Sequence, residues 1–336
     1  MSPAITIGAN DVGLARAQAE WLATLVRATH PQLSVNLELL NTQIGKSPLH
    51  DDHVAENRTI IRVLHDCLRD GDVDIVIHNA FDLRSKLPDD LRLGCILPRR
   101  SPYDALLCVD GRTFDELDPS ERVGVVQLRA RAQLLDHRPD ISYRLIHGDV
   151  GNWLTALLDA EIKALVAPNA ALELLGLQER VTELFPPELI VPAPGSGLLL
   201  CLCRGDDRDM SQMLGELHDP AAAAEYHSEV AFVRALGDEW ERPVGALAQQ
   251  MNRGIGLMGV VASPDGSEIL RRGIQTTEHS AQELGEALAE LMIDEGALRI
   301  IGGESDASPA ASIVGVLTTD ADWSEQDEWD EEDWEL

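Results

Sequence analysis

The stretch DVDIVIHN, residues 72–79, is the part of the chain that decides the fold class. It is short and rich in β-branched residues, which predicts a buried strand. A helical pattern over about 59–69 leads into it, and Gly71 ends that helix. Further upstream lie a strand, a helix and a second strand, over ITIG (5–8), residues 13–28 and SVNLELL (34–40). This alternation is typical of an open α/β sheet, in which the polar stretch 41–58 is expected to be a loop.

A second α/β unit is expected from about Pro98 onward. Its predicted strands are ALLCV (105–109), VGVVQ (123–127), SYRLI (142–146) and ALVAP (164–168). Its predicted helices cover residues 128–137, 150–160 and 169–183. An apolar strand pair over 186–204, broken at 194–197, then returns toward the first unit. A chain that crosses over and returns in this way indicates a cleft between two α/β domains.

A third unit covers about 219–303 and opens with a long helix. A hairpin over 255–274 follows, with Asp265-Gly266 at its turn, and a helix over about 280–295 closes the unit. The expected domains are therefore 1–98 with 194–215, 99–193 and 219–303, followed by 304–336 as a linker and acidic tail.

The charge balance excludes several classes of partner. The 336 residues include 27 Lys and Arg against 58 Asp and Glu, a formal net charge of −31. Nucleic acid and anionic membrane surfaces both need a basic surplus, so neither is expected as a partner. Residues 320–336 hold ten acidic residues, no Lys or Arg, and three Trp. Such a block repels itself and is expected to be disordered, and it could dock to a basic protein partner.

Cysteine usage and the N-terminus point to the cytoplasm. The five cysteines are an odd number scattered through apolar runs, unlike a disulfide framework, and no signal peptide or membrane-spanning run is seen. The expectation is a reduced cytoplasmic monomer. The pattern His50-Asp51-Asp52-His53 could ligate a metal, but it lacks a fixed spacing, so no metal is expected.

Several segments, in order along 5–303, resemble the porphobilinogen deaminase (hydroxymethylbilane synthase) family. DVDIVIHNAFDLRSKLP (72–88) is similar to the family segment D-I-A-V-H-S-x-K-D-x-P. The other similar segments are IGANDVGLARAQA (7–19), VGVVQLRARAQLLDHRPD (123–140), IHGDVGNWLTAL (146–157), ALVAPNAALELLGL (164–177), PAPGSGLLLC (192–201) and AFVRALGDEWERPVGA (231–246).

The resemblance implies two α/β domains of the periplasmic-binding-protein type with the active site between them. It also implies a small α+β C-terminal domain with a cysteine that holds a dipyrromethane cofactor. The implied activity joins four porphobilinogen molecules into linear hydroxymethylbilane in tetrapyrrole biosynthesis. The small-molecule ligand is accordingly expected to be of the pyrrole type.

Asp82 falls on the catalytic aspartate of the resemblance. A carboxylate in a cleft can accept pyrrole N–H bonds and stabilise a developing cation. The alternative interpretation is a turn aspartate that follows a strand. The cofactor cysteine falls on Trp240, whose indole has no thiolate, so the attachment point is absent. Cys201 and Cys203, in strand alternation, are most simply core residues.

The resemblance also places a set of groups that bind the carboxylates of the substrate and cofactor. These positions fall on Asn10, Asn79, Arg129, His147 and Ser196, and on Asn57, beside which Arg58 is the candidate. Others fall on Val12, Phe81, Ala130 and Trp153. Asn, Phe and Trp cannot replace a bidentate arginine, so the set is depleted of charge. Three hypotheses follow: a divergent synthase that uses Asp82, a pseudoenzyme that binds a tetrapyrrole-like or other small ligand in the cleft, and an interaction protein that docks by its acidic tail.

Overall fold

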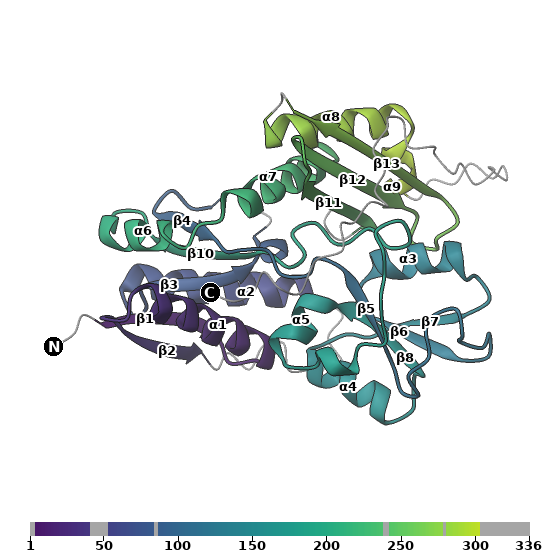
Figure 1. The fold of residues 1–336 in the computed structure, drawn as a ribbon, viewed down its shortest axis with the longest axis horizontal. Coiled ribbons are helices and arrows are strands. Elements are labelled where there is room, and N and C mark those ends of the chain that lie inside the picture. The colour runs from purple at the N-terminus through teal and green to yellow at the C-terminus, as the bar shows by residue number, and fades with distance from the viewer. Residues whose placement is uncertain (1–3, 41–52, 84–86, 238–241, 278–279, 303–336) are drawn as a thin grey trace.

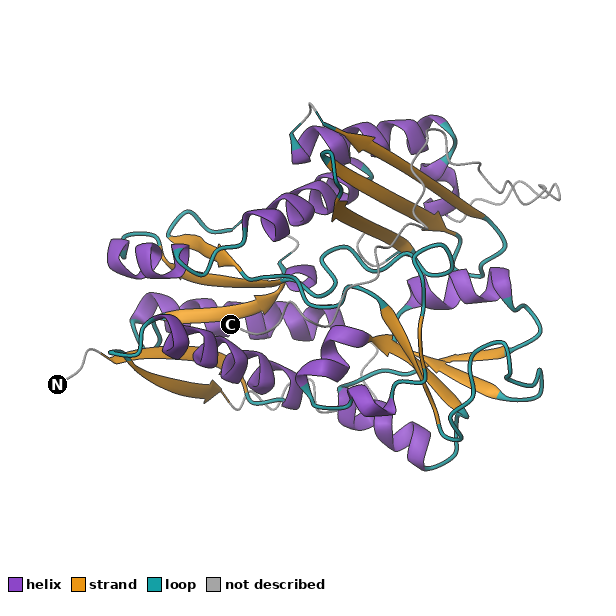
Figure 2. Ribbon diagram, in the orientation of Figure 1, coloured by secondary structure: helices purple, strands orange, loops and turns teal. Residues whose placement is uncertain are grey.

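In the computed structural model, residues 4–40, 53–83, 87–237, 242–277 and 280–302 are described, with the side chains of 53–57 excepted. Three sheets, each with its own helices, divide this part of the chain (Figures 1 and 2). We call them unit 1, unit 2 and unit 3. The exact boundaries of the three domains stay a prediction, as do the tail and the linker, which lie outside the described residues.

Unit 1 is a five-stranded sheet of order β2-β1-β3-β10-β4, in which β10 alone runs antiparallel to its neighbours. Its strands are β1 (Ala4–Asn10), β2 (Ser34–Leu40), β3 (Ile75–Asn79), β4 (Leu91–Ile96) and β10 (Leu199–Arg204). Its helices are α1 (Gly13–Thr29), α2 (His53–Asp70), η1 (Ala80–Asp82) and α6 (Arg208–Gly215).

The two faces of this sheet are both covered, because alternate strand residues point to opposite sides. Ile75 and Ile77 pack with α1, whereas Val76 packs with α2 and with apolar residues of unit 3. Burial on both faces explains why the deciding stretch is a nearly continuous apolar run and not an alternating one. The α/β character expected from the sequence is therefore confirmed.

Unit 2 repeats the design with the order β7-β6-β8-β5-β9, where β6, β7 and β8 are parallel and β5 is antiparallel to β8. Its strands are β5 (Asp104–Cys108), β6 (Arg122–Val125), β7 (Ser142–Leu145), β8 (Ala164–Pro168) and β9 (Glu183–Leu184). Its helices are α3 (Leu128–His137), α4 (Val150–Leu158), α5 (Asn169–Leu174) and η2 (Gln178–Arg180).

Unit 3 is an antiparallel sheet, β11-β12-β13, with two long helices packed against it. The elements are α7 (Pro220–Ala235), β11 (Val244–Gln250), β12 (Ile255–Ala262), β13 (Ile269–Thr276), α8 (Ala281–Asp294) and α9 (Ala297–Gly302). The expected hairpin is present, and Gly266 at its turn has a φ of 73°. Every residue of β12 is buried. The helices of unit 3 cover one face of its sheet, and Val191 and Tyr103 pack against the other face.

Three expectations about elements are wrong. The stretch 53–58 belongs to α2 and not to a loop, because the helix begins at His53, ahead of the apolar period that starts at residue 59. The helix expected over 169–183 ends at Leu174, because Gly176 adopts a φ of 69° and Leu177 N–H donates back to Leu172 O at 2.8 Å. The stretch 186–204 holds one strand, β10, and not a pair.

Two segments connect units 1 and 2 and lie side by side. The chain leaves after β4 through residues 97–103 and returns through 186–198 (Figure 1). Arg100 N–H donates to Gly197 O at 3.0 Å, and Arg99 Nε donates to Ser196 O at 3.0 Å. Gly197 has a φ of 76°, and a Cβ there would collide with Arg100 O, so only glycine fits. These hydrogen bonds join the two crossings to each other.

Candidate functional site

The predicted site lies where the parallel strands of unit 1 end. Asn10 is the last residue of β1, Asn79 is the last of β3, and Asp82 ends the single turn η1 that follows. In open α/β sheets, ligands bind outside the carboxyl ends of the strands. The fold thus brings Asn10, Asn79 and Asp82 to the same edge of the sheet, with Asn10 buried and the other two half-buried.

A chain of hydrogen bonds orients the Asp82 carboxylate. Gln18 Nε2 donates to Asn79 Oδ1 at 2.6 Å, and Asn79 Nδ2 donates to Asp82 Oδ2 at 2.9 Å. Gln18 is 3% exposed, so the first donor is anchored in the packing of α1. Gln18 is not among the site residues that the sequence predicts, and its only signal there is a polar residue close to the apolar Ala19 and Leu22.

Unit 2 faces this edge with the corresponding ends of its own strands. Helix α1 contacts both α4 and α5, and Leu175 approaches Gly13 at the start of α1. Figure 1 shows the same end of α1 pointing at α5. Because α4 and α5 follow β7 and β8 directly, the carboxyl ends of the parallel strands of both units lie on the sides that meet.

Arg129, the one arginine of the predicted set in unit 2, is held inside the protein. Its side chain is 4% exposed. Its Nη2 donates to Asp104 Oδ2 at 2.8 Å and to Gln127 Oε1 at 2.6 Å, while Nη1 donates to Val191 O at 2.6 Å. The Asp104 side chain is only 3% exposed, so this is a buried ion pair. The guanidinium thereby joins α3 to β5 and to the returning segment.

The loop before α4 and the first turn of that helix carry two further positions of the resemblance. His147 is exposed and Trp153 is half-buried. Asp149 caps the helix, because its Oδ1 accepts from Asn152 N–H at 3.1 Å. Trp153 Nε1 donates to Gly148 O at 3.1 Å, so the indole is tied to the loop in front of its own helix. The positive end of the α4 dipole thus already faces a carboxylate of this chain.

The remaining predicted residues lie on α2, in the returning segment and outside the described residues. The returning segment runs beside η1, because Ala80 N–H donates to Leu198 O at 3.0 Å. Arg58 is an exposed side chain on α2. Ser196 is half-buried in the returning segment, where its backbone oxygen accepts from Arg99. Trp240, at the position of the missing cofactor cysteine, lies outside the described residues.

All five cysteines are described, and none is exposed. Cys95, Cys108, Cys201 and Cys203 are buried and Cys67 is half-buried. Burial raises the pKa of the Cys67, Cys108 and Cys203 thiols. The pKa of Cys201 is raised by its hydrogen bond with Cys95 and by burial. Burial of Cys201 and Cys203 confirms that they are core residues, and a raised pKa disfavours the reactive thiolate.

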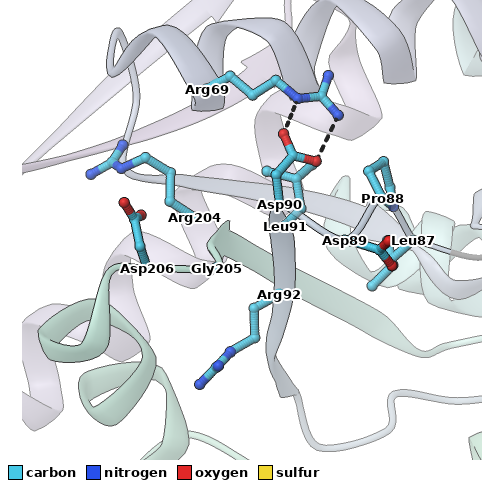
Figure 3. A pocket seen from close by; sticks show the side chains of 10 residues that line it. All are labelled: Arg69, Leu87, Pro88, Asp89, Asp90, Leu91, Arg92, Arg204, Gly205 and Asp206. Atoms are coloured by element: carbon cyan, nitrogen blue, oxygen red, sulfur yellow. Dashed lines mark hydrogen bonds and ion pairs between the residues drawn. The ribbon is translucent and has the colours of Figure 1, made fainter.

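A pocket of about 820 Å³ opens at the opposite edge of unit 1 (Figure 3). Arg204 and Leu91, which line it, pair at the end of β10 and β4 farthest from Asn79. Arg69 binds Asp90 through Nε at 2.5 Å and Nη2 at 3.3 Å, as the dashed lines in Figure 3 mark. Arg204 pairs with Asp207 at 2.9 Å and with Asp74 at 3.3 Å. This pocket is therefore separate from the Asp82 edge.

Two searches of the described part of the chain bear on other kinds of site. No group of three or more His, Cys, Asp or Glu side chains is arranged to hold a metal there, and the side chains of the His50–His53 pattern lie outside the described part. Within the same described ranges, no helix is long and apolar enough to span a bilayer.

Comparison with known proteins identifies the family. Residues 5–212 match the family model described as porphobilinogen deaminase, dipyrromethane cofactor binding domain. The porphobilinogen deaminase of Syntrophotalea carbinolica is 34% identical over 304 residues, which cover 89% of this chain and 96% of that protein. That of Roseiflexus castenholzii is 34% identical over 307 residues, covering 90% and 100%.

Among solved structures, the methionine-binding protein MetQ is similar to 68% of this chain and 94% of its own, with a TM-score of 0.41 and 15% identity. The match of the family model over most of the chain, together with relatives at one-third identity over nearly their whole length, shows that the chain belongs to the porphobilinogen deaminase family.

Proposed function

We propose that this protein acts in tetrapyrrole biosynthesis on an aminomethylpyrrole held between units 1 and 2, as the hydroxymethylbilane synthases of its family do. The observation that carries the proposal is the Asp82 carboxylate, which Asn79 and Gln18 orient at the carboxyl edge of unit 1. Family membership over nearly the whole chain supports the substrate class.

The proposed role of Asp82 is electrostatic. An aminomethylpyrrole that loses ammonia leaves a cation delocalised over the ring and its nitrogen. A carboxylate that accepts the pyrrole N–H stabilises that cation more than the neutral ground state, which lowers the barrier. Asn79 and Gln18 keep the carboxylate in place, so little reorganisation is needed when the charge develops.

The dipyrromethane cofactor that the family uses does not fit the residues present. A thioether needs a thiolate that can reach the cofactor, and every cysteine of this chain is buried or half-buried. We therefore propose that no dipyrromethane is attached through a cysteine, and we derive no step through it.

This observation favours a second candidate function: a pseudoenzyme of the family that binds a tetrapyrrole-like or other small ligand without turnover. Both candidates place the ligand at Asp82. They differ in whether ammonia is released and a carbon–carbon bond is formed.

Asp82→Asn tests both candidates, with Asp70→Asn as the matched control because Asp70 is exposed at the end of α2. Turnover of porphobilinogen is expected to fall by about 10²-fold in Asp82→Asn, and the control is expected to keep it. Ammonia release and product absorbance measure the activity, while intact mass reports any covalent pyrrole adduct.

A wild-type protein that binds porphobilinogen without releasing ammonia would replace the first candidate by the second. A wild-type protein that neither binds nor converts porphobilinogen would refute the first candidate, and one that also fails to bind hydroxymethylbilane would refute the second. An adduct mass of two pyrrole units would show that the cysteine argument is wrong.

The remaining expectations belong to the same proposal. We place the protein in the cytoplasm as a monomer, which agrees with five unpaired cysteines. We assign the acidic residues 320–336 to a basic protein partner on charge alone. Sedimentation velocity tests the monomer, and a pull-down with the tail deleted tests the partner.

A further inference from the structure

The pocket at the edge of unit 1 opposite to Asp82 has no part in the proposed function (Figure 3). It lies where α2 and β10 end and β4 begins, and its volume is about 820 Å³. Small-molecule sites commonly have volumes of about 300–1,000 Å³, so a ligand of that kind fits. We propose that this pocket is a second binding site, and that its ligand is an ω-amino acid, a chain with an acid group at one end and an amine at the other.

The described residues that line the pocket carry charges of both signs in equal number. The arginines are Arg69, Arg92 and Arg204, and the carboxylates are Asp89, Asp90 and Asp206. Their formal charges cancel, within a chain whose net charge is −31. A lining of this kind does not attract a polyanion, because the surrounding field is negative. The matching ligand is one whose own two charges also cancel.

Two of these arginines are held by carboxylates of the chain itself. Arg69 donates to Asp90 through both Nε and Nη2. Arg204 Nη2 donates to Asp207 at 2.9 Å and to Asp74 at 3.3 Å. A ligand acid could reach either guanidinium only in competition with these pairs. Arg69 and Arg204 therefore shape the wall of the pocket, and the counterion for a ligand acid has to come from elsewhere.

Arg92 can supply that counterion. It lies on β4, the outermost strand of the sheet, opposite Cys203 of β10, and its side chain is exposed. Within the described ranges, its guanidinium has no hydrogen bond or ion pair, and Figure 3 draws it without a dashed line. A guanidinium can bind a carboxylate through two parallel N–H···O bonds. We assign the acid end of the ligand to Arg92.

Asp206 supplies the opposite charge. It is exposed in the turn that follows β10, and its carboxylate has no partner among the residues that the structure describes. The turn is fixed against the start of β4, because Gly205 N–H donates to Asp90 O at 2.8 Å. A Cβ at position 205 would lie 3.0 Å from the same oxygen, so this close approach favours glycine. We assign the amine end of the ligand to Asp206.

The spacing of these two groups favours a ligand whose charges are several bonds apart. Arg92 lies opposite Cys203, which precedes Asp206 by three positions. At about 3.3 Å per residue, three positions of strand correspond to about 10 Å. An α-amino acid carries both charged groups on one carbon and spans this separation less well than an ω-amino acid. Apolar residues also line the pocket and can contact the methylene chain: Leu87, Pro88 and Leu91.

The test titrates the full chain with 6-aminohexanoate and follows binding by saturation-transfer NMR. Hexanoate and hexylamine are the matched probes, because each keeps only one of the two charged ends. We expect 6-aminohexanoate to bind with a Kd of about 1 mM or tighter. Each half-probe should bind at least about tenfold more weakly, and Arg92→Gln and Asp206→Asn should each weaken 6-aminohexanoate by about tenfold.

Arg208→Gln and Asp209→Asn are the controls, because both residues are exposed on α6 and do not line the pocket. They should leave the affinity unchanged, and circular dichroism checks that every variant is folded. Hexanoate that binds as tightly as 6-aminohexanoate would show an anion site and overturn the proposal. Unchanged affinity in Arg92→Gln or in Asp206→Asn would also overturn it, as would the absence of binding at about 10 mM. These outcomes do not depend on porphobilinogen, so the proposed function stands or falls separately.

Discussion

At the residue scale, the most informative side chain is Arg129. Its position in the sequence suggests a ligand group, but its environment makes it a structural cation that ties α3 to β5. A buried pair of this kind gives little net stability, yet it is costly to break, because one charge remains without its partner.

Asp104→Ala is therefore expected to lower the free energy of unfolding by about 3–5 kcal/mol. The double change Asp104→Leu with Arg129→Met should recover most of that loss, because it removes both charges. Urea unfolding followed by circular dichroism measures the difference. Asp115→Ala is the control, since its side chain is 83% exposed, and an equal loss there would contradict the assignment.

A pair of buried histidines makes stability depend on pH. His65 and His78 meet edge to face with ring centroids 5.3 Å apart. Burial, and to a smaller extent His65, lowers the pKa of His78 to about 3. Burial also lowers the pKa of His65. In the unfolded chain a histidine has a pKa of about 6.5. Between that pH and pH 3, position 78 therefore gains a proton in the unfolded state only.

The stability contributed by neutral His78 is thus complete above pH about 6.5 and is lost as the pH falls toward 3. From pH 7 to pH 5 the expected loss is about 2 kcal/mol for His78 alone. His78→Leu should remove this part of the pH dependence, and His137→Leu, a half-exposed control, should not. The urea midpoints at pH 7 and pH 5 measure this loss. If His78→Leu lost as much stability between the two pH values as the wild type, the assignment to His78 would be wrong.

At the element scale, α7 is joined to the crossing segments by one carboxylate. Glu229 is fully buried and accepts from Arg99, from Gly195 N–H at 2.5 Å and from Ala248 N–H at 2.8 Å. Burial raises the pKa of this carboxyl against the opposing effect of Arg99. The contacts connect α7, β11 and both crossings, so the position of unit 3 depends on this residue.

Glu229→Gln is expected to lower the free energy of unfolding by about 3 kcal/mol, because buried Arg99 loses its closer counterion. Glu290→Gln, on the exposed face of α8, should change it by less than about 0.5 kcal/mol. Chemical unfolding gives both values, and limited proteolysis reports whether unit 3 is released first. If Glu229→Gln left the free energy of unfolding unchanged, the crossing segments would hold unit 3 without this charge.

Element boundaries could be predicted only where one residue type marks them. Helix α3 and strand β8 have the predicted bounds, because a strand-to-helix change of period and a following proline are local signals. The predicted helix over 169–183 is too long. Gly176 ends it by adopting a left-handed conformation, and the sequence does not show which glycines adopt one. Strands β4 and β11 were missed, because partners far along the chain stabilise them.

At the scale of the whole molecule, the reactivity of the five thiols depends on whether the chain is folded. They are buried or half-buried in units 1 and 2, although they are spread over 137 positions, from 67 to 203. The native protein is therefore expected to react slowly, at no more than one thiol, with Ellman's reagent. Denaturation should expose all five. Rapid reaction of two or more native thiols would contradict this burial and would reopen the question of a cysteine anchor.

The sequence by itself determined the α/β class, because that follows from local periodicity. It also determined the family and the motif to which Asp82 belongs, because these follow from the order of the similar segments. It also determined that position 240 is Trp and that the chain is strongly acidic. Only the tertiary structure decided what the cations do. Arg129 meets Asp104 across 25 positions of sequence, and Arg99 meets Glu229 across 130. The energy of a charge depends on burial and on its nearest counterion, and both are properties of the folded chain alone.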